Sequence, residues 1–131
     1  AEAYTPAAGR YNAGELGNFI LIPMLSASLK QILEWDVANI SSYCSSLTQP
    51  LAAWLREHEY TVEDDQARSP HIMGVGMPAS MDMDVVIRGL QERKIFVSRR
   101  GKAIRVSAHV YNTQKDIDAL KDALSALRKS S

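Results

Sequence analysis

Residues 103–113 read AIRVSAHVYNT, and their pattern decides how the C-terminal half of the chain folds. Apolar and polar residues alternate along the stretch, and successive side chains of a strand point to opposite faces of a sheet. A strand here places Ile104 and Val106 on one face and Arg105 on the other. The pattern therefore predicts a strand over 103–111 with one face in a core and one polar face.

A helix is expected directly after this strand. Thr113 can cap it, and Asp116 lies three residues further on, which resembles a capping box with aspartate in place of glutamate. Working outward, helical spacing and short apolar runs bounded by glycine or proline predict the remaining elements. Helices are expected over about 23–35, 40–55 and 80–93, and strands near 60, over 71–77 and over 95–97.

The order helix, helix, strand, strand, helix, strand, strand, helix predicts an α+β fold. We expect a two-layer domain in which a short mixed or antiparallel sheet packs on helices. The opening AEAYTPAAGRYNAGELGN has no periodicity and does not begin with methionine, so it is interpreted as a cut through a longer protein.

Composition excludes several classes of function. The chain has 131 residues, 46% of them hydrophobic, which suits one compact domain. Fifteen basic and fifteen acidic residues balance, so nucleic acid is not expected as a partner. No apolar run reaches the roughly 20 residues that cross a bilayer, and a single cysteine, Cys44, fits a reducing compartment. The sequence predicts no membrane partner and a cytoplasmic location.

Arg105 is the residue most suited to bind a ligand. A guanidinium fixed on a rigid strand can hold a carboxylate or phosphate through two parallel hydrogen bonds. The alternative from the pattern alone is a solvated strand arginine paired with a surface acid. His58, His71 and His109 lie too far apart to predict a metal site.

Three short motifs carry a resemblance to a known family. They are KIFVS at 94–98, IRVS at 104–107 and YNT at 111–113, and a helix with an early acid follows them. In this order they resemble the C-terminal signature of the class V aminotransferase-like enzymes, which include cysteine desulfurases, selenocysteine lyases and isopenicillin N epimerase-like proteins. The stretch 10–47 also resembles the region where the large domain of these enzymes continues into the small one.

The resemblance implies a pyridoxal-phosphate enzyme that acts on an amino acid. Residues 1–35 would be a remnant of the large domain or linker, and residues 36–131 the C-terminal small domain. In the family the strand arginine binds the α-carboxylate of the substrate, and this role passes to Arg105. The missing N-terminal large domain and a second copy, forming a homodimer, are the implied partners.

Further site residues follow from the same resemblance. The region around Gly14 would lie near the cofactor phosphate of a neighbouring subunit, which makes Glu15 and Asn18 candidate cofactor-binding residues. An ordinary residue at a helix N-terminus is the alternative for Asn18. Arg99 and Arg100 would line the substrate entrance, with solvated turn charges as their alternative.

The catalytic machinery is expected to lie outside this chain. The cofactor lysine of the family precedes everything present here, so the parent protein would be the enzyme and this chain alone would be inert, with no cofactor bound and no catalytic residue. No cysteine occurs over 98–103, where a desulfurase would carry its thiol, and Cys44 is interpreted as a buried hydrophobe. The rival hypothesis is a non-catalytic binding or assembly module that retains the small-domain fold.

Overall fold

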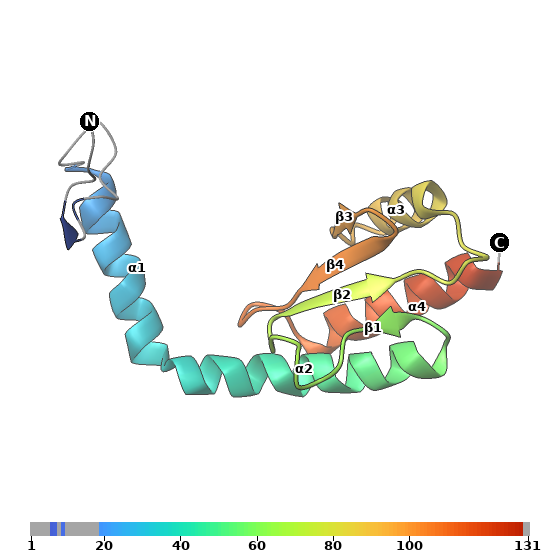
Figure 1. Ribbon diagram of the computed structural model, residues 1–131, viewed down its shortest axis with the longest axis horizontal. Helices are drawn as coiled ribbons and strands as arrows, with labels where there is room; N and C mark the ends of the chain where they lie inside the picture. The colour runs from blue at the N-terminus through green and yellow to red at the C-terminus, as the bar shows by residue number, and fades with distance from the viewer. Residues whose placement is uncertain (1–5, 8, 10–18, 130–131) are drawn as a thin grey trace. The chain divides into compact units, whose positions relative to one another are not determined.

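A computed structural model of the chain describes residues 6, 7, 9 and 19–129 (Figure 1). The element order is α1 (Leu21–Trp35), α2 (Val37–Glu57), β1 (Thr61–Val62), β2 (Ile72–Gly76), α3 (Met83–Glu92), β3 (Ser98–Arg100), β4 (Ala103–Ser107) and α4 (Gln114–Lys129). This is the α+β order expected from the sequence. The chain forms two units, residues 1–37 and residues 38–131.

The first unit contains α1. Its apolar residues repeat at helical spacing, as the sequence predicts, yet none of its residues is buried. Leu25, Leu29 and Leu33 are all exposed, and Leu33 keeps 73% of its surface. The spacing of the apolar residues predicts that this helix forms, but it does not predict what the helix packs against. The apolar face of α1 is exposed.

The second unit is built on an antiparallel sheet with strand order β1-β2-β4-β3. The longest ladder joins β2 to β4 and pairs Ile72 with Ser107 at one end and Gly76 with Ala103 at the other. In this register the buried residues Met73 and Val75 of β2 lie opposite Val106 and Ile104 of β4. The sheet therefore has a core face and an open face.

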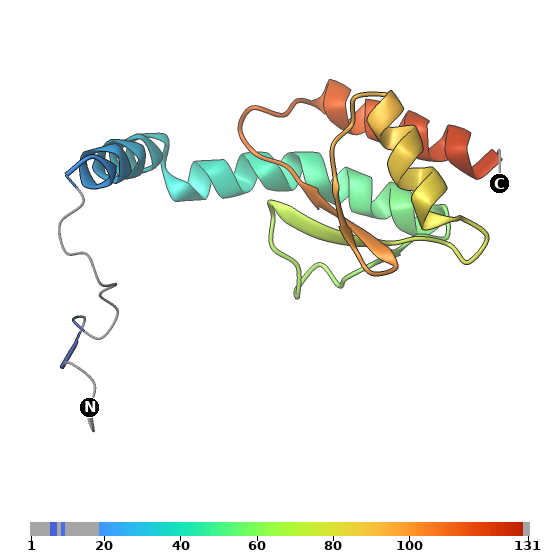
Figure 2. The same cartoon turned by 90° about the horizontal axis from the view of Figure 1, so that it is seen from above.

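Helices α2, α3 and α4 cover the core face (Figure 2). Each presents a stripe of buried side chains to the strands. The fully buried residues include Leu51, Leu55, Leu90, Leu124, Met73, Val75 and Ile104. The stripe predicted for the last helix is confirmed, because Ile117, Leu120, Leu124 and Leu127 are all buried.

Local capping fixes where α3 and α4 begin. Asp82 accepts hydrogen bonds from the backbone N–H groups of Asp84 and Val85, which satisfies the free donors at the start of α3. The carboxylate of Asp116 accepts from the backbone N–H of Thr113 at 2.7 Å, as in the predicted capping box. Both helices therefore start at positions determined by short sequence signals.

Two strand predictions are wrong in their limits. The strand expected over 95–97 is shifted to Ser98–Arg100, and the strand expected over 103–111 ends at Ser107. A turn follows β4, in which the backbone N–H of His109 donates to the side chain of Asn112 at 3.0 Å. The backbone after Ser107 turns away and does not continue the pairing with β2. The alternation of apolar and polar residues in the sequence therefore extends beyond the end of β4.

Leu51→Ala tests the core assignment. Leu51 is fully buried, so its truncation leaves a cavity and is expected to lower the free energy of unfolding by about 3 kcal/mol. The matched control Leu33→Ala, on the exposed face of α1, should change it by less than about 0.5 kcal/mol. Urea unfolding followed by circular dichroism measures both. Equal losses would show that the two leucines are similarly packed.

Candidate functional site

Arg105 lies on the open face of the sheet, in the middle of β4. Its cross-strand neighbours are Gly74 of β2 and Ser98 of β3. One guanidinium nitrogen donates to the hydroxyl oxygen of Ser98 at 3.3 Å, while Nε is buried without a hydrogen-bond partner. A buried donor without a partner is costly, and Nε would gain an acceptor from a ligand only if this half-buried side chain moves towards the open face.

Several residues of the open face around Arg105 are small, although Ile72 and Arg100 also share this face. Gly74 and Gly76 of β2 and Ala103 and Ser107 of β4 share this face by the ladder register. These small side chains leave space beside the arginine, and at Gly74 the carboxylate of Glu63 fills part of it. A carboxylate is suited to this site, because it can accept two hydrogen bonds from one guanidinium.

The loop that follows β1 is held by a small network of charges. Asp65 forms ion pairs with Arg56 of α2 and with Arg68, whose side chain is only 4% exposed. Arg56 also donates to the backbone oxygen of Glu63 at 2.9 Å. Hydrogen bonds from Arg56, then Arg68, lower the pKa of Asp65 to about 2. The loop from Glu63 to Arg68 is therefore fixed to α2.

The two arginines expected at the substrate entrance point to different faces. Arg99 pairs with Ile104, a core residue, and its guanidinium forms an ion pair with Asp84 of α3. Arg100 pairs with Ala103, on the same face as Arg105, and is exposed. The structure therefore brings Arg100 to the face of Arg105 and leaves Arg99 on the helical side. Glu15 and Asn18 lie outside the described residues.

The residues present do not fit a site that holds pyridoxal phosphate by itself. A lysine that forms a Schiff base is usually desolvated or close to another cation, which lowers its pKa. Of the lysines only Lys121 is half-buried, and it lies on α4 with the helical layer; the others are exposed. None of these described lysines has the enclosed surroundings that such a bond needs.

The described part of the chain contains neither a reactive thiol nor a group of side chains that could bind a metal ion. Cys44 is fully buried in α2, its sulfur lies 3.6 Å from the carbonyl oxygen of Ala108, and burial raises the pKa of its thiol. A protonated, enclosed thiol is a poor nucleophile. Among residues 19–129, no group of three or more histidine, cysteine, aspartate or glutamate side chains is arranged to hold a metal ion. No described helix is long and apolar enough to cross a bilayer.

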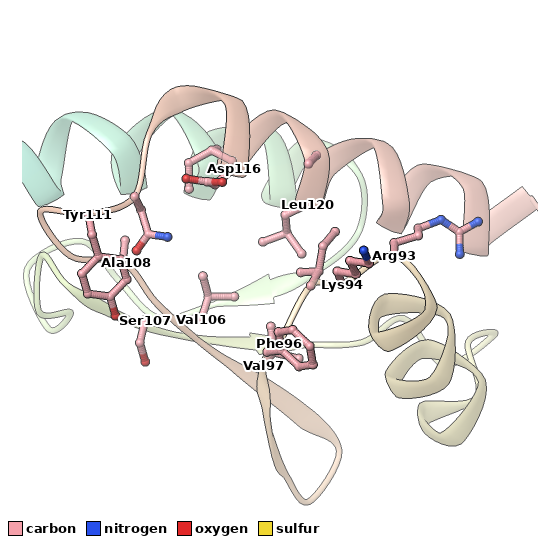
Figure 3. A pocket seen from close by; sticks show the side chains of 14 residues that line it. Arg93, Lys94, Phe96, Val97, Val106, Ser107, Ala108, Tyr111, Asp116 and Leu120 are labelled. Atoms are coloured by element: carbon pink, nitrogen blue, oxygen red, sulfur yellow. The ribbon is translucent and has the colours of Figure 1, made fainter.

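A cavity of about 480 Å³ is lined by residues other than Arg105 (Figure 3). It lies between the start of α4, the end of β4 and the segment 93–97 that joins α3 to β3. Phe96 and Tyr111 lie on opposite sides of it and are largely exposed, while Leu120 faces it from α4. Sequence reasoning missed this cavity because it placed 95–97 in a strand, and the cavity exists because that segment makes no ladder with β4.

Comparisons with known proteins define the class of fold. No family model matches the chain, and no curated protein sequence matches it. Solved structures do match, and they are consistent with the small C-terminal domain of cysteine desulfurases and class V aminotransferases. The chain therefore has the fold of this class of domain.

Three of the matching structures illustrate the likeness. A NifS-like protein from Rickettsia africae has a TM-score of 0.79 at 16% identity, over 98% of this chain and 39% of its own. A cysteine desulfurase from Escherichia coli has a TM-score of 0.79 at 19% identity, over 96% and 34%. An alanine–glyoxylate aminotransferase from Nostoc has a TM-score of 0.66 at 20% identity, over 93% and 34%. The chain spans little more than a third of these proteins.

Acid unfolding tests the charge network around Asp65. Its folded-state pKa of about 2 lies below the ordinary value of 3.8, so the ionised carboxylate stabilises the fold above pH 4. This contribution is lost as the pH falls through about 2. The melting temperature of Asp65→Asn should lie below that of the native chain at pH 5, and the two should converge near pH 2. A gap that stays constant over this range would contradict the assignment.

Proposed function

We propose that this chain is the small domain of a pyridoxal-phosphate enzyme related to the class V aminotransferases. The match to solved structures over a third of their length supports the fold, and the IRVS motif at 104–107 supports the kinship. Residues 1–35 would be the remnant of the large domain or linker and 36–131 the small domain. The parent protein would transform an amino acid in the cytoplasm, as a homodimer.

Arg105 is the residue that carries the proposal. It stands on a rigid strand, it faces away from the core, and its Nε has no hydrogen-bond partner. In the parent enzyme it would bind the α-carboxylate of the substrate and so orient the amino acid. Pyridoxal phosphate, held by a lysine of the large domain, would supply the electron sink for the reaction. This chain would contribute binding and orientation.

The exposed face of α1 supports the proposal of a missing large domain. None of its apolar side chains is buried, and Leu25, Leu29 and Leu33 keep between 50% and 73% of their surface exposed. An apolar helical face of this kind is typical of a surface that packs against another domain or subunit. The large domain of the parent protein is the partner we propose for it.

Arg105→Ala in the longer protein tests the binding role. Losing a charged hydrogen-bond partner costs about 1.5–3 kcal/mol, so kcat/KM for the amino acid should fall roughly ten- to hundredfold. Cofactor absorbance should be unchanged. Arg105→Lys should recover only part of the loss, because an ammonium group cannot bind a carboxylate bidentately. Unchanged kinetics in Arg105→Ala would remove Arg105 from the site.

Adding pyridoxal phosphate separates the enzyme from a module that retained only the fold. The 131-residue chain should give no saturable Schiff-base absorbance, because its lysines are exposed or half-buried on helices and turns. A longer protein that includes the large domain should give one bound cofactor per chain, trapped by borohydride and counted by mass spectrometry. Absence from the longer protein would favour the binding or assembly module.

A further inference from the structure

Glu63 holds its carboxylate directly over β2. Val62 pairs with Val75, so Glu63 is the next residue along and lies beside Gly74. One of its carboxylate oxygens accepts a hydrogen bond from the backbone N–H of Gly74 at 3.0 Å. A Cβ at Gly74 would lie only 2.3 Å from the other oxygen, so the carboxylate occupies the space of the missing side chain. The acid is therefore fixed in place.

This carboxylate stands beside Arg105 on the open face. Gly74 is the cross-strand neighbour of Arg105, and such neighbours have Cβ positions about 4.5–5.5 Å apart. The two charges nevertheless form no ion pair, because the guanidinium of Arg105 donates to Ser98 on the far side. Arg105 takes part in none of the four ion pairs found among the described residues. Its charge is therefore free to bind a ligand next to a fixed negative charge.

The neighbouring acid restricts what the rest of that ligand can carry. With one carboxylate of the ligand on Arg105, a group that extends towards β2 meets Glu63. We propose that Glu63 selects monocarboxylates whose other end is neutral or positively charged and disfavours dicarboxylates. This inference rests on the proposed role of Arg105 in binding a carboxylate.

Coulomb's law indicates the size of the effect. Two unit charges about 7 Å apart change affinity roughly threefold in water, and more where the effective dielectric constant is lower. Arg100 shares the open face and acts in the opposite direction, since it attracts a second carboxylate. The preference of the native chain for one ligand charge over another therefore reflects both Glu63 and Arg100. Changing Glu63 alone separates them, because Arg100 is the same in both proteins.

The test uses three ligands of similar length with different charges at the far end. Succinate carries a second carboxylate, succinamate an amide and 4-aminobutyrate an ammonium group. The probe is the Nε–H resonance of Arg105 in the ¹⁵N-labelled 131-residue chain at pH 7.5. In Glu63→Gln the affinity of 4-aminobutyrate relative to succinamate should fall about threefold. In Glu63→Gln the affinity of succinate relative to succinamate should rise about threefold or more.

Controls keep the fold and the net charge comparable. Glutamine retains an oxygen that can accept from Gly74, so Glu63→Gln should keep the β1–β2 contact. The matched control is Glu57→Gln, an exposed residue of α2 with the same loss of charge, and it should leave the ligand series unchanged. If Glu63→Gln disturbs the spectrum broadly, Gly74→Ala provides a second variant, because it displaces the carboxylate without removing it. Gly74→Ala should reduce the difference in affinity between succinate and succinamate.

The outcomes separate two failures. If succinamate leaves the Arg105 resonance unmoved in the native chain, the carboxylate site itself is wrong, and the proposed function loses its anchor. If succinamate binds but neither Glu63→Gln nor Gly74→Ala alters the order of the ligands, the site stands and selection by Glu63 is wrong. A rise in relative succinate affinity confined to the Glu63 and Gly74 variants supports the inference.

Discussion

The ladder between β2 and β4 is the constraint on which the rest of the second unit depends. It pairs Ile72–Gly76 with Ser107–Ala103 and so fixes which side chains of both strands face the helices. A shift of β4 by one residue would turn Ile104 and Val106 into solvent and bury Arg105. The burial of this apolar set therefore also holds the arginine on the open face.

Charges on the open face are positioned by backbone contacts. Glu63 is held through the N–H of Gly74 and, at its own carbonyl oxygen, by Arg56 of α2. Arg105 is anchored by its strand and leans towards Ser98. Glu63 and Arg105 form no ion pair with each other, although they lie on the same face.

Two apolar surfaces are left uncovered among the described residues. The helix α1 buries none of its residues, and the cavity beside Phe96 and Tyr111 leaves part of the core accessible. The matching solved structures are more than twice as long as the part that this chain covers.

Local sequence signals determined the element order, the alternating faces of β4, the stripe of α4 and its capping by Asp116, because each depends on residues a few positions apart. Arg105 could be chosen as a candidate for the same reason. Glu63 could not, since its relation to Arg105 exists only through pairing of β1 with β2 and β2 with β4. Tertiary pairing likewise ended β4 at Ser107 and decided that Arg100, rather than Arg99, shares the face of Arg105. Ladder bonds form between segments far apart in the chain, so a sequence pattern can favour a strand without fixing its limits or its neighbours.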